Sequence, residues 1–424
     1  MDSGGIDDPP SHRAAKALGL AVLLAALRWA YLEHPWPVHG DEMSFVSALG
    51  FPAQYPVHHP GYPLWVAMGT ALNALGFSPY ASYQAWSVAA SVLLPVLCYL
   101  ALRRSVRDSL AWWTALALGV CPLLWFVGTT ALNYAAGCTL GWVIIVLCHQ
   151  SMAEHRARPL LAAALVMAIG LCLRVDLLLT VGPVIAFAVW RGRAVGGFKA
   201  LLILAGGVIL LTVATAAVYG RADVRLPAPH LRHTVDVVLN TSVFRLGPVD
   251  GLARNAVKLG INIGWHMGAA ALLLPLAVMY NGRGAKRDTR ILLLLWWMPT
   301  AAFLLLIHMT EPGHMLPLLP PAYCLIALWL NDRFRPEAAD RWMRAIVFVS
   351  VIQFVAYPWS ASSTGFKRIL DAKIGYVSGE GLRHIDRRAE IHAPGDFWQT
   401  PLHRKEPPTN QDNEKSKQEE ADGR

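Results

Sequence analysis

The chain has 424 residues, of which 55% are hydrophobic and only 15% are charged. A water-soluble domain carries nearer a quarter charged residues, so this composition excludes an ordinary soluble protein and favours a polytopic α-helical membrane protein. The formal net charge of +9 does not indicate nucleic-acid binding, because most Lys and Arg residues lie in short links between apolar blocks.

Apolar blocks along the chain predict an all-α fold with about eleven transmembrane helices. The stretch 61–77 is also apolar but opens with Gly-Tyr-Pro and contains Asn73, and we expect it to lie in, or dip into, the membrane interface. The predicted spans are 14–32, 81–102, 110–127, 131–148, 160–173, 177–190, 200–219, 259–280, 291–307, 315–330 and 345–359.

Basic residues follow every second span, whereas the other short links contain Arg174 as their only basic residue. The positive-inside rule therefore places the N-terminus and the basic links in the cytoplasm. This predicts a cytoplasmic tail 1–13 and a transmembrane domain 14–360 with outer loops at 33–80 and 220–258. An outer segment 361–405 and a disordered tail 406–424 would follow.

The first outer loop concentrates residues that perform acid/base, metal and sugar chemistry. Asp41 and Glu42 could supply a general base and a metal ligand or orienting group, provided that the backbone after Gly40 is irregular; alternatively, Asp41 caps an interfacial helix. His58 and His59 stand between prolines that fix the backbone. A histidine here could bind a cation, a phosphate or a sugar hydroxyl, or it could meet lipid headgroups.

Arg174 and Asp176 interrupt a long apolar stretch from 160 to 190. Charges within a membrane cost roughly 2.5–3.5 kcal/mol each on insertion scales, so they are usually paired or functional. The two residues are therefore either part of a site at the outer interface or a structural ion pair. Arg28, one turn before the end of the first span, is expected to extend outward to the interface.

Three further groups are weaker candidates for the outer face. Arg225 and Arg232 in the second large outer loop could bind phosphate or attract anionic headgroups. His314 begins a span broken by prolines, which could line a cavity or form a kinked helix. Asn133 and Tyr134 stand together at the start of an outer helix.

Three segments resemble the integral-membrane GT-C glycosyltransferases, and most closely the bacterial enzymes similar to protein O-mannosyltransferases. The first is the acidic pair followed by His58-His59-Pro-Gly-Tyr-Pro-Leu; the others are Leu-Arg-Val-Asp-Leu-Leu-Leu around Arg174 and Met-Leu-Pro-Leu-Leu-Pro-Pro-Ala from Met315. The resemblance covers residues 29–330 with loose spacing. The double histidine departs from the single His before Pro-Pro of many relatives.

The resemblance implies a GT-C-like fold and transfer of a sugar from a polyprenyl-phosphate donor on the outer or lumenal side of a bacterial inner membrane or the ER. Asp41 would be the base or cation-binding residue, and Glu42 the second catalytic carboxylate. Some relatives use a divalent cation, so Mg²⁺ or Mn²⁺ could bind at Asp41 and His59. The acceptor would be a lipid, glycan or protein. The donor phosphate and sugar would meet His58, His59, Arg174, Arg225, Arg232 and His314.

Two other classes of protein compete with the enzyme. A transporter or lipid flippase would also use broken helices and intramembrane charges, which would converge at the bilayer midplane. A non-catalytic membrane subunit would not depend on Asp41. The sequence contains no Walker loop or dinucleotide fingerprint, so it offers no site for ATP or a nicotinamide cofactor.

Overall fold

The computed structural model describes residues 10–29, 40–50, 62–191, 196–220, 239, 242–281, 285–307 and 312–355. The side chains of a few residues within these ranges, Asp41 among them, lie outside the description. The chain divides into two compact units, Met1–Leu382 and Arg383–Arg424, and every described residue belongs to the first.

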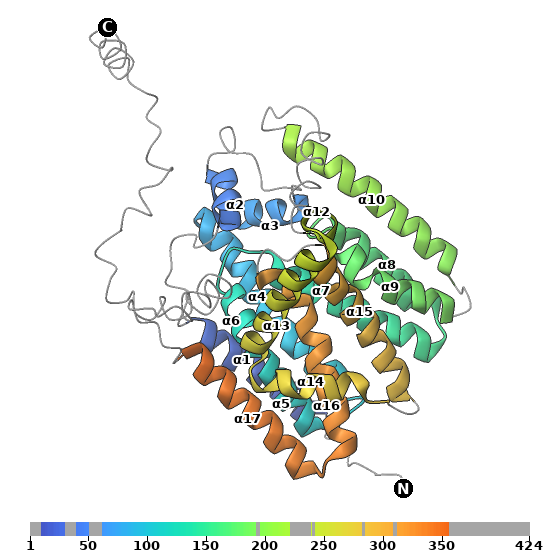
Figure 1. The fold of residues 1–424 in the computed structure, drawn as a ribbon. Helices are drawn as coiled ribbons and strands as arrows, with labels where there is room; N and C mark the ends of the chain where they lie inside the picture. The colour runs from blue at the N-terminus through green and yellow to red at the C-terminus, as the bar shows by residue number, and fades with distance from the viewer. Residues whose placement is uncertain are drawn as a thin grey trace, which may run out of the picture. The chain divides into compact units, whose positions relative to one another are not determined.

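The described residues form helices and no strand, as the composition predicts (Figure 1). The helices are α1 (Pro10–Trp29), α2 (Gly40–Gly50), α3 (Pro63–Ala74), α4 (Pro79–Leu102), α5 (Asp108–Gly119), α6 (Pro122–Val127), α7 (Tyr134–Glu154), α8 (Ala157–Leu171), α9 (Leu177–Arg191), α10 (Gly197–Gly220), α12 (Val243–Leu246), α13 (Pro248–Met267), α14 (Ala269–Met279), α15 (Ala285–Leu306), the 3-10 helix η1 (Pro312–Leu318), α16 (Leu319–Arg333) and α17 (Pro336–Val355).

Among the described residues, each predicted span overlaps a helix or a pair of helices, and two of the spans are broken. The predicted span 110–127 is broken between α5 and α6, where Pro122 cannot continue the hydrogen-bond ladder. The span predicted at 259–280 bends by 111° between α13 and α14, at Gly268, whose φ of +52° favours glycine. Broken helices at membrane depth are tolerated where they are buried in protein.

The count of about eleven spans is not confirmed. Five described helices are long and apolar enough to cross a membrane, or six if α13 and α14 form one bent span. Helices α8 and α9 have only 15 residues each, which is shorter than the roughly 20 residues that a bilayer core requires. Helix α3, in the stretch expected to lie in the interface, has 12 residues and is likewise too short to cross.

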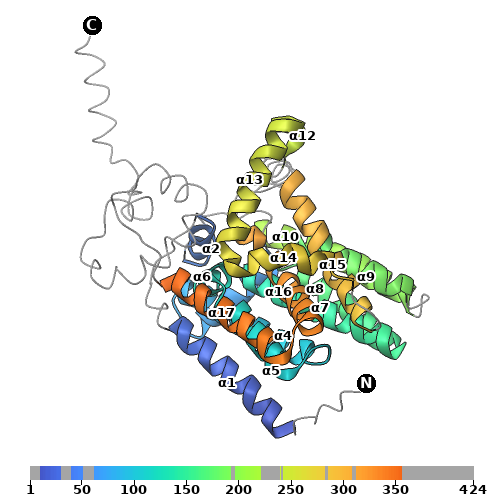
Figure 2. The same ribbon diagram turned by 60° about the horizontal axis from the view of Figure 1, so that its bottom comes forward.

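The core is formed by helices that are apolar on all sides. In the candidate span Gly313–Arg333, which joins most of η1 to α16, 83% of the apolar window lies inside the protein, whereas the corresponding share for Gly197–Thr215 in α10 is 17%. Figure 1 shows α10 running along the outside of α8, against which it packs. The exposed apolar face of α10 is what a lipid-facing helix requires, because lipid rather than protein covers it. Figure 2 shows α13 beside α15, its packing partner.

The prediction that Arg28 extends outward to the membrane interface is wrong, because its side chain is fully buried. Its Nε donates to Ser91 Oγ at 2.6 Å, and Nη2 donates to the carbonyls of Ser91 and Gly119 at 3.1 Å each. Nη1 donates to the carbonyl of Leu24 at 3.2 Å. The guanidinium therefore finds acceptors on α1, α4 and the end of α5, which makes burial tolerable.

Candidate functional site

Four connections that the charge pattern predicts to be extracytoplasmic meet at one end of the fold, which we call the α2 end. It comprises α2 and α3, the turn 128–133, the link 172–176 and η1. Backbone and side-chain hydrogen bonds join these parts: Leu64 N donates to Cys172 O at 2.9 Å, and Ser87 Oγ on α4 donates to Leu132 O at 2.6 Å. The sequence separations are large, so the convergence is a property of the fold.

Glu42 ties α2 to the turn 128–133. Its side chain is fully buried, and Oε1 accepts a hydrogen bond from the backbone N–H of Ala131. Asp41 and Glu42 both lie in the first turn of α2. The irregular backbone that would bring two adjacent carboxylates to one site is therefore absent, because neighbours on a helix point about 100° apart.

An aromatic cluster holds α2 and α3 against α4. Trp65 is completely buried and stacks on Tyr83 with ring centroids 5.3 Å apart. Phe45 of α2 contacts the rings of Tyr62 and Tyr83 at 5.8 Å and 5.7 Å. Tyr62 adopts a left-handed conformation (φ +39°) directly before Pro63, the first residue of α3. Such close aromatic contacts fix the positions of α2 and α3 relative to α4.

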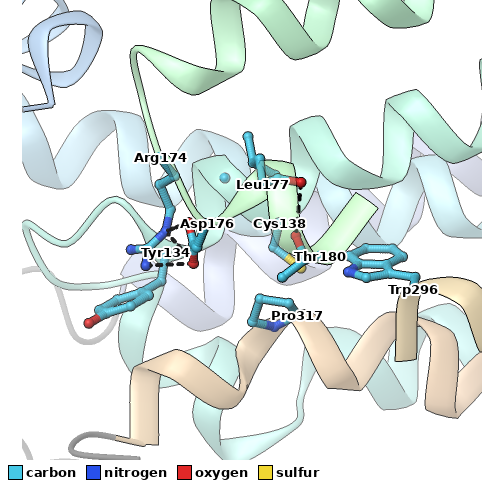
Figure 3. Close-up of a pocket in the computed structure, with 9 residues that line it drawn as sticks. Tyr134, Cys138, Arg174, Asp176, Leu177, Thr180, Trp296 and Pro317 are labelled. Atoms are coloured by element: carbon cyan, nitrogen blue, oxygen red, sulfur yellow. Dashed lines mark hydrogen bonds and ion pairs between the residues drawn. The ribbon is translucent and has the colours of Figure 1, made fainter. Parts of the chain in front are cut away.

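Arg174 forms the charged centre of the α2 end (Figure 3). Its Nε and Nη2 each donate to Asp176 at 2.9 Å, and Nη1 donates to Asn133 Oδ1 at 2.7 Å. The guanidinium lies 4.2 Å from the ring centroid of Tyr134, a cation–π contact. Asn133 in turn donates to Leu173 O at 3.0 Å. Three of the five N–H groups of Arg174 thus have partners among the described residues.

Glycine makes room for this arginine. A Cβ at Gly137, one turn into α7, would stand 2.4 Å from Arg174 Cδ. Because Asp176 and Asn133 hold the guanidinium, the arginine cannot simply swing away. The lack of a side chain at Gly313 likewise leaves space for Tyr134, because a Cβ at this position would lie 2.6 Å from the tyrosine ring.

His314 reaches the same centre from η1. Its Nε2 lies 3.4 Å from Tyr134 Oη, and the two rings meet edge to face at 5.5 Å. Pro317 lies inside this 3-10 helix and cannot donate a backbone hydrogen bond. His314 and Arg174 therefore both contact Tyr134.

A pocket opens beside this centre and contains about 260 Å³ of space, including what is open to solvent. Figure 3 shows Arg174, Asp176 and Tyr134 at one side of it and Cys138, Thr180 and Trp296 at the other. The wall is thus charged on one side and mostly apolar on the other. Such a lining suits a ligand with a polar head and an apolar part.

The ion pair is charged over the whole neutral range. Burial alone would lower the pKa of Arg174 and raise that of Asp176, but their mutual attraction outweighs burial and moves both the other way. The pKa of Asp176 is held below its usual value, and His314 contributes to this shift. The guanidinium keeps its positive charge when an anion approaches.

The remaining predicted site residues lie outside the description. These are His58, His59, Arg225, Arg232 and the side chain of Asp41. Their roles, and that of Glu42 as a catalytic group, stay predictions. Among the described residues, no group of three or more His, Cys, Asp or Glu side chains could hold a metal ion. The two residues expected to bind a cation, Asp41 and His59, are not covered by that search.

Three contacts were hard to foresee from the sequence. Asn133 and Tyr134 were only weak candidates at the start of an outer helix, yet both contact Arg174, which lies 41 and 40 residues further along the chain. Their only local signal was a pair of polar groups at the end of an apolar block. The backbone N–H of Ala131, which binds Glu42, carries no sequence signal at all.

The fold and this end of it define an integral, multi-pass, all-helical membrane protein with the GT-C-like architecture that the sequence resemblance implied. The chain is similar in structure to ArnT from Cupriavidus metallidurans bound to undecaprenyl phosphate, with a TM-score of 0.57 and 16% identity over 84% of this chain and 67% of that one. The apo form of the same protein gives a TM-score of 0.56 and 18% identity over 88% and 73%. No family model and no curated protein sequence matches the chain.

Proposed function

We propose that this protein transfers a sugar from a polyprenyl-phosphate donor to an acceptor hydroxyl at the α2 end, on the extracytoplasmic side of the membrane. The main supporting observation is the pocket lined by Tyr134 and by the Arg174–Asp176 ion pair. His314 contacts Tyr134 at this pocket, and α3 is hydrogen-bonded to the link that contains Arg174. The fold in which this occurs is shared with a protein crystallised with undecaprenyl phosphate. A donor of this kind carries its own apolar anchor, which accounts for a site at the membrane surface without a nucleotide-binding fold.

The chemistry requires one bond to form and one to break. The acceptor oxygen attacks the anomeric carbon of the sugar, and the bond from that carbon to the phosphate oxygen breaks. The acceptor proton passes to a carboxylate, and the electron pair leaves with the polyprenyl phosphate. A general base and a cation near the phosphate are therefore the two protein groups that the reaction needs.

We assign the base to Asp41 and the phosphate contact to Arg174, assisted by Arg225 or Arg232. Two observations support the assignment of Arg174: it keeps its charge, and only three of its five N–H groups have partners among the described residues. Glu42, buried and hydrogen-bonded to Ala131 N, is better suited to holding α2 in place than to proton transfer. His58, His59 and His314 would contact the sugar or the phosphate. A divalent cation, if one is used, would bind at Asp41 and His59.

The experiment uses the full-length protein purified in detergent and a panel of radiolabelled polyprenyl-phosphate sugars. The proposal expects release of polyprenyl phosphate from at least one donor, either to water or to a lipid, glycan or protein acceptor. Heat-inactivated protein serves as the blank. The absence of cleavage for every donor would contradict the proposal.

The same material separates the enzyme from a transporter or flippase, which the structural comparisons do not favour. In proteoliposomes, a flippase would move the labelled donor between leaflets with its glycosidic bond intact. A transferase consumes the donor without needing such movement. Intact translocated donor as the only product would overturn the proposed function.

A further inference from the structure

A second cavity lies at the opposite end of the fold and has no part in the proposed function. It is bounded by the C-terminal end of α4, by α7 and by α15, and it contains about 540 Å³ of space, including what is open to solvent. Most of the lining is apolar, with Trp142, Leu292 and Leu293 as its largest members.

Polar groups gather at one side of this cavity. His149 Nε2 and Thr289 Oγ1 are hydrogen-bonded at 3.0 Å, and Arg104 and Ser105 complete the polar lining. Arg104 is exposed, so its charge stands at the mouth of the cavity. Asp288 is the carboxylate that acts on His149, and it faces the same histidine as Arg104. A donor-rich mouth over an apolar interior suits an amphiphile with an anionic head.

The surroundings add positive charge. The links that meet here, which we call the basic end, include Arg103, Arg107, Arg290 and Arg333. Several of these already have partners: Arg107 binds Asn331 Oδ1, and Arg290 donates to Val278 O at 2.7 Å. Arg104 lines the cavity and is the cation best placed to meet a ligand head. The charge bias predicts this end to be cytoplasmic, where anionic lipids are drawn to basic pockets between helices.

We propose that this cavity binds one anionic phospholipid of the surrounding membrane. The first part of one acyl chain contacts the apolar lining at Trp142 and Leu293, and the phosphate headgroup meets Arg104, Ser105 and His149. A free phosphate would leave the apolar interior empty. Because the lipid touches α4, α7 and α15 together, its binding stabilises the folded bundle.

The test measures lipid adducts of the full-length protein by native mass spectrometry in detergent, with phosphatidylglycerol and with phosphatidylcholine of the same acyl chains. We expect phosphatidylglycerol to bind at least tenfold more tightly and to raise the melting temperature. Arg104→Ala should bring the two lipids to equal affinity. Its control is Arg156→Ala, an exposed arginine at the same end that pairs with Glu154 and should leave the preference unchanged.

A second pair of variants tests the apolar interior. Leu293→Trp fills the cavity and should weaken phosphatidylglycerol binding at least tenfold, whereas Leu201→Trp, on the 58% exposed side chain of α10, should not. If Leu293→Trp fails to fold, Ala101→Phe fills the same cavity from α4. Equal binding of the two lipids to the wild type, or undiminished binding to the filled variants, would overturn the proposal. Displacement of the lipid by millimolar inorganic phosphate would assign the site to free phosphate instead.

Discussion

The two ends of this protein use arginine in opposite ways. At the basic end Arg156 is 72% exposed and reaches Glu154 at 3.3 Å. At the α2 end Arg174 is 8% exposed and reaches Asp176 at 2.9 Å, with an amide and an aromatic ring as further partners. The first arrangement leaves the charge in water, and such charges set topology. The second buries the guanidinium and fixes its orientation.

The energetic difference follows from solvation. An exposed pair such as Arg156–Glu154 contributes about 0–1 kcal/mol, because water screens it and both side chains lose freedom. A buried guanidinium that lost its partners would leave the remaining charge uncompensated, at a cost of several kcal/mol. A charge is therefore expected to be buried only where its fixed position serves a function. Substitutions at the α2 end should lower activity, and substitutions at the basic end should not.

The largest expected effect is that of Asp41→Asn. The amide is nearly isosteric but cannot accept the acceptor's proton, and a general base contributes about 10²–10⁴-fold to rate. We expect transfer to fall within that range while expression is retained. Glu154→Gln makes the same chemical change at the basic end, and its turnover should match the wild type. Equal activities of the two variants would contradict the claim that catalysis depends on the α2 end and not on the basic end.

Replacement of Arg174 should have the second-largest effect on turnover. Arg174→Lys keeps the charge but loses the fork that binds two oxygens at once, and we expect kcat to fall about tenfold or more, with Arg156→Lys unchanged. The double variant Arg174→Ala/Asp176→Ala separates the two roles of the arginine. It removes the uncompensated carboxylate and should recover melting temperature relative to Arg174→Ala, but not turnover. Recovery of turnover would make Arg174 a structural partner only.

Glu42 tests whether both carboxylates of the acidic pair take part in the chemistry. Glu42→Gln retains an oxygen that can accept from Ala131 N, so we expect turnover within a few-fold of the wild type. Glu42→Ala leaves that buried N–H without its acceptor, at about 1–3 kcal/mol, and should lower the melting temperature. A loss of turnover in Glu42→Gln as large as that in Asp41→Asn would show that Glu42 is catalytic.

The smallest effect concerns the space beneath Arg174. Gly137→Ala places a methyl group 2.4 Å from Arg174 Cδ, and overpacking of this kind costs about 1–3 kcal/mol. Gly206→Ala in α10 is the matched control, because nothing lies within 4 Å of its Cβ and alanine favours the helix. Thermal unfolding should therefore show opposite shifts. A destabilisation of similar size in both variants would contradict this account, because the contact with Arg174 could not then be its cause.

Hydropathy predicted where the helices lie along the chain, and the charge pattern predicted which of their connections meet at the same end of the fold. Spans such as α4 and α7 are long apolar blocks, and alternate links collect Arg residues, so local composition determines both. The Arg174–Asp176 pair was visible because its members are two residues apart. These features depend on neighbours in sequence, which a pattern can show.

What escaped prediction depends on partners distant in sequence. Arg28 was expected at the interface, but the carbonyls of Ser91 and Gly119, on two other helices, allow it to be buried. Asn133 binds Arg174 across 41 positions. The bend at Gly268 comes within an apolar block that reads as one continuous span. Tertiary contacts determine all three features, and no local sequence pattern predicts them.

The claim that the α2 end and the basic end face opposite sides of the membrane underlies all of these assignments. It is tested by placing one cysteine at Leu75, 76% exposed beyond α3, and another at the exposed Arg335, each in an otherwise wild-type chain. The six native cysteines are buried and should label little. In intact cells a membrane-impermeant thiol reagent should modify Leu75→Cys and spare Arg335→Cys until the membrane is opened. Equal labelling of both in intact cells, or the reverse pattern, would contradict an extracytoplasmic active site at the α2 end.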